Sequence, residues 1–549
     1  MSFLQLVRRE MRGSLRKLVF MSAIGGVSSA AILAAINAGA QAAGDNKQSK
    51  LWAVTLFAIS LFLFIKSQPY VTTTIAAEIE AIIHRFRVRL MDRVRRSELL
   101  AIEKIGRARI FAAITGDAAV LTQASNTLAY SMQSIVLIFF ISIYVVYLSP
   151  AAFALSVVII GLAGTIFHFR SRRLTVERTK AAGHERRLFD RLADFLDGFK
   201  EVRLNSARSA DLFDDAIEVS RTAANIKIRA QVDTFRQIVS VQSYMYILLG
   251  AVVFGAPAFS GSVGGESLTK ATTALLFVVG ACFGLVQSIP ILSNANAAAD
   301  RLEELEADLH ATVSTEAVDE VRTREHFDKI EMRDIVFRYV DRFSETAFQI
   351  GPIDFTLRAG ELVFITGGNG SGKSTFLRVL AGLYPPDSGE ITLDGLRIND
   401  HTRDTYRALM SAIFFEYHLF HRLYGVRDPD PAEVDRLLTQ FRLEDKTGLS
   451  NGEFRTLDLS GGQRRRLALI VSLLEKRPIL LLDEWTAEQD PEYRRKFYEE
   501  LLPEMMRAGT TVVVITHDDR YLDELDLPAR RIRMDEGRIV GERSMQNRG

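Results

Sequence analysis

The chain contains a single cysteine, Cys282, among 549 residues, and this scarcity limits its chemistry. One cysteine excludes a disulfide within the chain and a cysteine-rich metal site. The apolar surroundings of Cys282 predict an inert core residue. Glycine- and serine-rich linkers and low-complexity stretches are also missing, so no segment has the composition of a flexible connection.

A large net charge of either sign is absent as well, because 68 basic residues nearly balance 67 acidic ones and leave +1. The balance hides two unlike regions. Residues 1–310 carry nine more positive than negative charges, and residues 311–549 carry eight more negative than positive charges. This asymmetry predicts two domains with different surroundings, divided near residue 310.

Charged residues are scarce in six apolar windows of the first region. The windows lie near 18–42, 51–75, 131–149, 151–169, 238–260 and 271–292, with a tight turn expected at Ser149-Pro150. Each can present the roughly twenty apolar residues that a helix needs to cross the hydrocarbon layer. Buried core helices are the alternative, but 51–65 and 135–148 are apolar on every face. Six such windows favour a membrane domain and exclude a soluble protein of nucleic-acid metabolism.

The basic residues between the windows predict how the chain crosses the membrane. Segments 1–17, 76–130 and 170–236 hold five, nine and fifteen basic residues, whereas the opposite loops hold only Lys47, Lys50 and Lys270. The positive-inside rule therefore places the N-terminus in the cytoplasm, and six crossings return residues 311–549 to that side. A cleavable signal ending near 38–42 is the alternative. It would leave five crossings, and its apolar run is longer than a usual signal has.

A phosphate-binding loop is predicted at 367–374, which reads GGNGSGKS and fits G-x-x-x-x-G-K-[ST]. Backbone N–H groups of such a loop surround phosphate oxygens, Lys373 reaches the β- and γ-phosphates, and Ser374 offers its hydroxyl to Mg²⁺. The flanking pattern of a strand at 361–366 and a helix at 375–383 supports this reading. The predicted nucleotide-binding residues here are Gly367, Gly368, Asn369, Gly370, Ser371, Gly372, Lys373, Ser374 and Thr375.

Two further apolar runs end in polar residues suited to hydrolysis. Residues 479–484 read ILLLDE, so Asp483 would hold the Mg²⁺ shell and Glu484 would polarise the attacking water. Residues 511–517 read TVVVITH, and His517 is a candidate contact of the γ-phosphate, although a lone histidine at a strand end is more often structural. The second region is therefore predicted to be an α/β P-loop domain that hydrolyses ATP.

Residues 459–463 read LSGGQ, and with the preceding motifs in this order the second region resembles the nucleotide-binding domain of ATP-binding cassette (ABC) proteins. The resemblance implies that Ser460, Gly461, Gly462 and Gln463 contact ATP held by a second cassette. It also implies that Tyr339 stacks on adenine, that Asp490 lies in the loop after the acidic strand, and that His517 is the switch histidine.

Two positions depart from the family pattern. Phe415 stands where the family usually has glutamine, and the neighbouring Glu416 is the candidate replacement ligand for the metal. Residues 487–490 read AEQD instead of the usual S-A-L-D and follow Trp485, at a position where proline is common. Glu484 is retained, so hydrolysis is still expected.

The whole chain resembles an exporter half-transporter, which implies an all-α six-helix transmembrane domain (1–310) fused to an α/β P-loop nucleotide-binding domain (311–549). A homodimer in the bacterial inner membrane, with ATP and Mg²⁺ as cofactors and its cassettes in the cytoplasm, follows from the same resemblance. Its GFKEVRLN and IFFEYHLF strings resemble the cyclic-peptide exporter group, in particular exporters of pyoverdine-type siderophore precursors in pseudomonads. That likeness implies an acylated, nonribosomally made peptide as cargo. A lipid or hydrophobic-drug exporter and an ATP-gated regulatory membrane protein are the alternatives.

Two roles stay open within the membrane region. Residues 194–205 contain a glycine between helical stretches, which is either an elbow that docks onto the cassette or an ordinary kink. Asn37, Gln133, Gln242 and Gln287 are uncharged polar residues that either line a cargo cavity or join helices.

Overall fold

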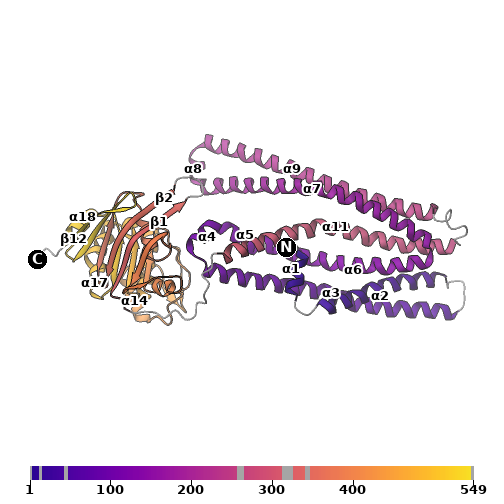
Figure 1. Ribbon diagram of the computed structural model, residues 1–549, viewed down its shortest axis with the longest axis horizontal. Coiled ribbons are helices and arrows are strands. Elements are labelled where there is room, and N and C mark those ends of the chain that lie inside the picture. The colour runs from indigo at the N-terminus through magenta and orange to yellow at the C-terminus, as the bar shows by residue number, and fades with distance from the viewer. Residues whose placement is uncertain are drawn as a thin grey trace. The chain divides into compact units, whose positions relative to one another are not determined.

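The computed structural model describes residues 3–11, 15–41, 47–255, 265–311, 326–340 and 347–545. Their contacts divide the chain into two compact units. The first consists of Met1–Asp92 and Arg107–Asp308, and the second of Arg93–Gly106 and Leu309–Gly549. Figure 1 shows the first unit as a set of long helices and the second as a sheet-containing domain.

Long helices that run alongside one another form the first unit (Figure 1). In the described ranges, six helical spans are long and apolar enough to cross a membrane by length and composition, which confirms the six predicted windows. The helices are α1 Phe3–Glu10, α2 Leu15–Gln41, α3 Lys47–Arg96, α5 Arg107–Ala112, α6 Ala118–Leu148, α7 Pro150–Asp197, α8 Phe199–Leu204, α9 Ser206–Gly250 and α11 Gly265–His310.

Local sequence explains where several of these helices end. Ser149 is in an extended conformation after α6, and its hydroxyl accepts a hydrogen bond from the Ala152 N–H at 3.2 Å, while Pro150 opens α7. This is the predicted tight turn. Gly198 separates α7 from the short α8, and the Asn205 side chain then caps α9 by accepting from the Arg208 N–H at 3.1 Å. The glycine between helical stretches in 194–205 is thus a turn at Gly198 between α7 and α8.

Polar side chains join some of these helices. The side-chain amide of Gln68 in α3 donates to Gln133 Oε1 at 2.7 Å, so the Gln133 side chain links α6 to α3. Gln242 instead donates to the Tyr246 hydroxyl one turn further along α9. Cys282 is free and half-buried against the apolar cluster of this unit. Of the polar residues considered above, Gln133 therefore has a helix-joining contact.

In the described part of the second unit, three sheets, mostly of short strands, form the framework. A four-stranded antiparallel sheet has the order β2-β1-β4-β5, and a six-stranded sheet has the order β12-β11-β3-β10-β9-β6, with β7 and β8 as a separate pair. In the six-stranded sheet all neighbours are parallel except β11 and β12. The strands are β1 Lys329–Val340, β2 Ala347–Arg358, β3 Leu362–Thr366, β4 Ser388–Leu393, β5 Leu396–Arg397, β6 Met410–Ile413, β7 Leu449–Ser450, β8 Glu453–Phe454, β9 Ile479–Asp483, β10 Thr511–Ile515, β11 Ala529–Asp535 and β12 Arg538–Met545.

Both faces of the parallel strands are covered, which explains their continuous apolar sequences. Leu362 and Phe364 of β3 belong to one buried cluster, and Val363 and Ile365 belong to a second cluster on the opposite face. The helices of this unit are α4 Leu99–Ile105, α12 Lys373–Leu380, α13 Arg403–Arg407, α14 Pro431–Gln440, α15 Gly461–Leu474, α16 Pro491–Lys496, α17 Leu502–Arg507 and α18 Asp519–Glu524. The predicted helix at 375–383 thus begins two residues earlier, because the phosphate loop passes directly into it.

Candidate functional site

The loop at 367–374 connects β3 to α12 and has the shape of a phosphate cradle. Gly372 adopts a left-handed backbone (φ +95°) just before the helix, and a Cβ there would lie 2.9 Å from Ile350 Cγ2. Glycine is therefore required for the loop to approach β2. Lys373 is buried, and its ammonium donates to the Gly367 and Gly368 carbonyl oxygens at 3.0 and 2.9 Å. Burial lowers the Lys373 pKa, while Glu484 and Asp483 oppose the shift.

A cavity of about 580 Å³ opens beside this loop, lined on one side by 369–375. Tyr339 and Phe348 are register partners on the paired strands β1 and β2, and both line the cavity. Phe415, Glu416, Asp483 and Glu484 complete it with Arg378. The aromatic side chains lie on strands near the loop, as the stacking role predicted for Tyr339 requires, and Phe348 is an additional aromatic that the sequence did not single out.

The acidic end of the cavity comes from β9, next to β10 and two strands from β3. Asp483 is almost fully buried, and one of its oxygens accepts a hydrogen bond from the Ser374 hydroxyl at 3.2 Å. Among the described residues, its second oxygen, Oδ2, and the buried hydroxyl of Ser371 have no hydrogen-bond partner. Burial raises the Asp483 pKa, and the bonds from Ser374 and the Phe415 backbone N–H partly offset it. An orphaned carboxylate oxygen beside a serine hydroxyl fits a hydrated Mg²⁺.

The described residues contain no cluster of three or more His, Cys, Asp or Glu side chains that could hold a metal. Mg²⁺ usually keeps several waters and binds one or two carboxylates together with phosphate oxygens. Ser374, Asp483 and, by its position on the cavity wall, Glu416 are the side chains available to such an ion.

Glu484 follows β9 in a left-handed conformation (φ +51°), an unusual one for a residue with a side chain. His517, which follows β10, places Nε2 3.1 Å from Glu484 Oε1. The fold therefore brings together two residues predicted from separate apolar runs. A carboxylate aimed into the cavity and oriented by a histidine has the geometry of a base for an attacking water.

Two other predicted elements lie elsewhere in the second unit. Ser460 caps α15 through a capping box in which its hydroxyl accepts from the Gln463 N–H at 3.4 Å and Gln463 Oε1 accepts from the Ser460 N–H at 3.0 Å. None of the described residues lining the cavity comes from 459–463. Asp490 caps α16 by accepting from the Tyr493 N–H at 2.8 Å, and it is likewise absent from the described lining.

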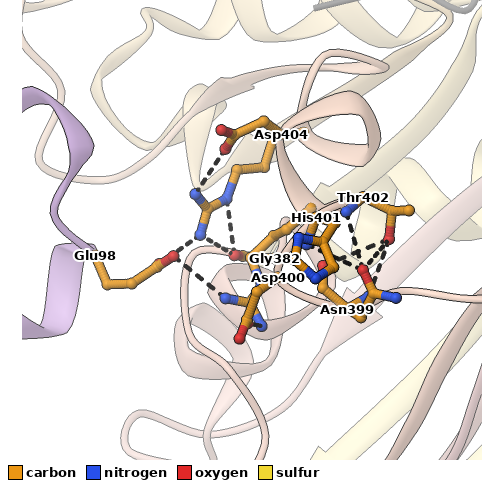
Figure 2. A network of polar contacts seen from close by, with 9 residues as sticks. Glu98, Gly382, Asn399, Asp400, His401, Thr402 and Asp404 are labelled. Carbon is orange, nitrogen blue, oxygen red and sulfur yellow. Dashed lines mark hydrogen bonds and ion pairs between the residues drawn. The ribbon is translucent and has the colours of Figure 1, made fainter. Parts of the chain in front are cut away.

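A polar network that the sequence did not reveal involves α4, which belongs to the second unit by its contacts. Glu98 Oε1 lies 3.2 Å from Arg403 Nη1, and Glu98 Oε2 lies 2.5 Å from Arg407 Nη2. Arg407 also donates to the Gly382 carbonyl oxygen at 2.6 Å. Figure 2 shows Glu98 extending from its own segment toward Gly382, which follows α12, and toward Asp400 and Asp404, which lie just before and within α13.

Further contacts fix α4 in this position. Tyr384 donates to Glu103 Oε2 at 2.8 Å, and burial followed by this hydrogen bond raises the Tyr384 pKa to about 12. Leu99 and Leu100 pack against the apolar cluster that includes α12. Because Glu98 and Arg403 are 305 positions apart, no local pattern indicates this pairing.

Comparison with known proteins identifies the family. Residues 350–487 match the family model described as ABC transporter. ATP-binding protein SyrD of Pseudomonas syringae pv. syringae is 34% identical over 538 residues, which cover 94% of this chain and 92% of that protein. This chain belongs to the ABC transporter family.

Two more likenesses refine the picture of the transporter. The "Probable syringafactin export ATP-binding/permease protein SyfD" of Pseudomonas syringae pv. syringae (strain B728a) is 34% identical to this chain over 206 residues. These residues cover 35% of this chain and 31% of that protein. The solved structure of a bacterial Atm1-family ABC exporter with ATP bound matches with a TM-score of 0.77 and 18% identity, over 97% of this chain and 96% of that one. The transporter therefore has the exporter fold of a six-helix membrane part joined to a cassette, and it couples ATP binding and hydrolysis to transport.

Proposed function

We propose that the transporter works as a homodimer in the bacterial inner membrane and exports an acylated, nonribosomally made peptide, such as a siderophore precursor, from the cytoplasm to the periplasm. Residues 1–310 would form the transmembrane domain and residues 311–549 the cytoplasmic cassette. Each exported peptide would pass between the membrane domains of two copies as their cassettes close on ATP and separate after hydrolysis.

The proposal of a homodimer is supported mainly by the position of LSGGQ, which lies outside the described lining of the cavity. The described lining of the ATP cavity holds residues 369–375 but nothing from 459–463. In one copy, Ser460, Gly461, Gly462 and Gln463 therefore form the second half of a site whose first half belongs to another copy. The N-terminus of α15 suits this role, because its free backbone N–H groups favour a γ-phosphate.

The chemical roles follow the geometry of the cavity. Lys373 and the loop N–H groups would bind the phosphates, Tyr339 would stack on adenine, and Ser374 with Asp483 would hold Mg²⁺, which neutralises the phosphate charge when bound. Glu416 is a candidate further ligand. Glu484 would accept a proton from the attacking water while His517 orients its carboxylate and approaches the γ-phosphate. Asp490 would act at the junction of the two copies, since it caps α16 outside the cavity.

The cargo assignment rests on the uncharged membrane helices and on the export function named for SyfD. Segments 118–169, 237–265 and 271–299 contain no Asp, Glu, Lys or Arg. Gln242 and Tyr246 nevertheless present an exposed hydrogen-bonded polar pair on α9. Apolar surfaces interrupted by amide and hydroxyl groups suit an amphiphilic molecule that has an acyl chain and peptide bonds.

We propose that α4 transmits movement between the cassette and the membrane helices when the cassettes close on ATP. Glu98 and Glu103 bind residues that follow α12, the helix that begins at Lys373. In the chain, α4 lies between α3 and α5. Residues 194–205, with α8, provide a second candidate elbow, which would dock onto the cassette of the other copy.

Stimulation of ATPase activity tests the cargo. The purified transporter in lipid vesicles should hydrolyse ATP several times faster with an acylated peptide than without it, and the same peptide lacking its acyl chain should have little effect. Stimulation by lipids or hydrophobic drugs alone would favour the alternative exporter class. Negligible turnover with ligand-dependent opening would indicate an ATP-gated membrane protein. Metabolites that accumulate in cells lacking the transporter would identify the peptide itself.

A further inference from the structure

Arg465 of α15 is a buried cation with no role in the site described above. Only 1% of the residue is exposed, and its side chain is among the largest that are fully buried. Taking a guanidinium out of water is unfavourable unless charged or polar groups compensate for the lost hydration. The groups that contact the buried guanidinium of Arg465 therefore indicate its role.

Those partners lie on the loop that follows β9. Arg465 Nη1 donates to the backbone carbonyl oxygen of Glu484. Its Nε lies 3.2 Å from Glu488 Oε2, and its Nη2 donates to Glu488 Oε1 at 3.4 Å. The Arg465 carbonyl oxygen in turn accepts a hydrogen bond from Trp485 Nε1 at 2.9 Å. The side chain and backbone of Arg465 thus contact three residues of 484–488, the segment after β9 that we call the hydrolysis loop.

The same guanidinium lies near two aromatic rings at the position where the family pattern is broken. Arg465 Cζ is 5.3 Å from the Phe415 ring centroid and 5.8 Å from that of Tyr417. The Phe415 backbone N–H also interacts with the Asp483 carboxylate and lowers its pKa, and both residues line the cavity. Phe415 therefore connects to the metal end of the cavity through its backbone and to Arg465 through its ring.

Glu484 needs such support because of its backbone conformation. Left-handed φ values are unfavourable for residues with a Cβ, and they persist at functional sites where surrounding contacts hold them. The Glu484 N–H donates to the Ile515 carbonyl oxygen at 3.0 Å, and the Glu484 carbonyl oxygen accepts from Arg465. Both peptide groups of the residue are thereby fixed, and its carboxylate is directed toward His517.

We infer that Arg465 is a positioning residue for hydrolysis, which holds the Glu484 backbone in the conformation that directs its carboxylate at the attacking water. This inference rests on the proposed role of Glu484. Arg465 is not among the described residues that line the cavity, so it would act only through the loop. Glu488 extends the arrangement to the LSGGQ segment, since a Cβ at Gly461 would lie 2.8 Å from Glu488 Oε2.

The test separates turnover from nucleotide binding in the full-length transporter in lipid vesicles. Arg465→Gln should lower kcat per nucleotide-binding site roughly tenfold or more, because a small misplacement of a catalytic group is costly. The dissociation constant of a fluorescent ATP analogue should stay within about twofold of wild type, because the phosphate loop is untouched. Arg465→Lys should restore only part of kcat, since a lysine cannot contact Glu484 and Glu488 with a planar fork.

Arg466→Lys is the matched control on the same helix. Arg466 stacks on Tyr493 at 3.9 Å and donates to the Phe441 carbonyl oxygen at 3.3 Å, away from the hydrolysis loop. Its replacement should leave kcat per site within about twofold of wild type. If Arg465→Gln does not fold, the kcat and nucleotide affinity of Glu488→Gln test the same inference. That variant changes a half-exposed carboxylate and should lower kcat a few-fold at unchanged nucleotide affinity.

Glu484→Gln distinguishes a failure of this inference from a failure of the proposed role. Loss of turnover in Glu484→Gln, together with a reduced kcat in the Arg465 or Glu488 variants, supports the inference. Loss of turnover in Glu484→Gln with unchanged kcat per site in the Arg465 and Glu488 variants overturns the inference alone. Normal turnover in Glu484→Gln overturns both, because no base would remain to be positioned.

Discussion

The two units of the transporter contain equally apolar segments that differ in what covers them. Every residue of β3, Leu362–Thr366, is buried by protein on both faces of its sheet. The apolar part of α3 is different, because Trp52 and Phe62 are 73% and 60% exposed within their own unit. A run of apolar residues in the cassette forms a protein core, and a run of similar composition in α3 requires lipid as its solvent.

Polar residues show the same contrast. In the cassette they gather at strand ends, where Asp483 and Glu484 line one cavity and His517 contacts Glu484. In the membrane unit they join helices singly, as Gln68 and Gln133 do. The chemistry is therefore concentrated in one unit, and the other unit provides the surface and the passage.

Lys373→Ala should abolish the function of the cassette. Loss of the ammonium that reaches the β- and γ-phosphates should weaken ATP binding and lower hydrolysis by roughly 100-fold or more, because positioning and charge stabilisation supply most of phosphoryl-transfer catalysis. Binding of a fluorescent ATP analogue and release of phosphate measure both effects. Lys476→Ala, which breaks an exposed ion pair with Glu433, is the control and should change neither. Normal hydrolysis by Lys373→Ala would place the catalytic centre elsewhere.

Truncation of a phenylalanine should destabilise the cassette far more than the membrane unit. Phe364→Ala leaves a cavity in a fully buried core and should destabilise the cassette by about 3–5 kcal/mol. Phe62→Ala removes an exposed ring and should change stability by about 0.5 kcal/mol or less. Thermal unfolding of the purified transporter measures both variants. Equal losses of stability would show that Phe62 is covered by protein and would remove the contrast between the units.

Glu98→Gln should disconnect the units without stopping the cassette. The amide loses the charge that holds Arg403 and Arg407, and hydrogen bonds to charged groups are worth about 1.5–3 kcal/mol. Peptide transport in vesicles should fall about tenfold while basal ATP hydrolysis persists. Glu304→Gln, in an exposed pair with Arg109, should leave transport unchanged. Equal losses of hydrolysis and transport in Glu98→Gln would contradict a coupling role for α4.

Acid should inhibit hydrolysis in a way that Mg²⁺ opposes. Burial raises the Asp483 pKa, so a proton competes for the carboxylate at higher pH than for an ordinary aspartate. Activity should therefore fall as pH decreases through that raised pKa, and about tenfold more Mg²⁺ should move the acidic limb to lower pH by up to about one unit. Profiles of ATPase activity at two Mg²⁺ concentrations measure the shift. A limb that does not move would separate Asp483 from metal binding.

Several features of this molecule could be predicted from local sequence patterns, because each of these features depends on residues that are close together in the chain. The glycine loop before α12, the buried strands ending at Asp483 and Ile515, and the six apolar spans each follow from a short run of residues. Contacts between distant segments were not predictable from such patterns. Arg465 reads as one of three consecutive arginines in 464–466, and nothing in that run distinguishes the buried side chain from its neighbours.

The same limit applies to the network of α4. Glu98 lies among charged residues at the end of α3, and its partners Arg403 and Arg407 come from the opposite half of the chain. Asp490 was assigned by its order in the motif, and its carboxylate caps a helix, a role that its position before Pro491 also favours. Motif order thus located the residues of the site, and packing determined which of them meet.

The central claim is that ATP hydrolysis by paired cassettes moves an acylated peptide across the membrane, and uptake by inside-out vesicles tests it most directly. Wild-type transporter should accumulate a labelled acylated peptide inside the vesicles only when ATP and Mg²⁺ are supplied outside. Vesicles with Lys373→Ala or Glu484→Gln should accumulate none. Accumulation that is equal in wild type and both variants, or steady ATP hydrolysis with no accumulation of this peptide, would contradict the account.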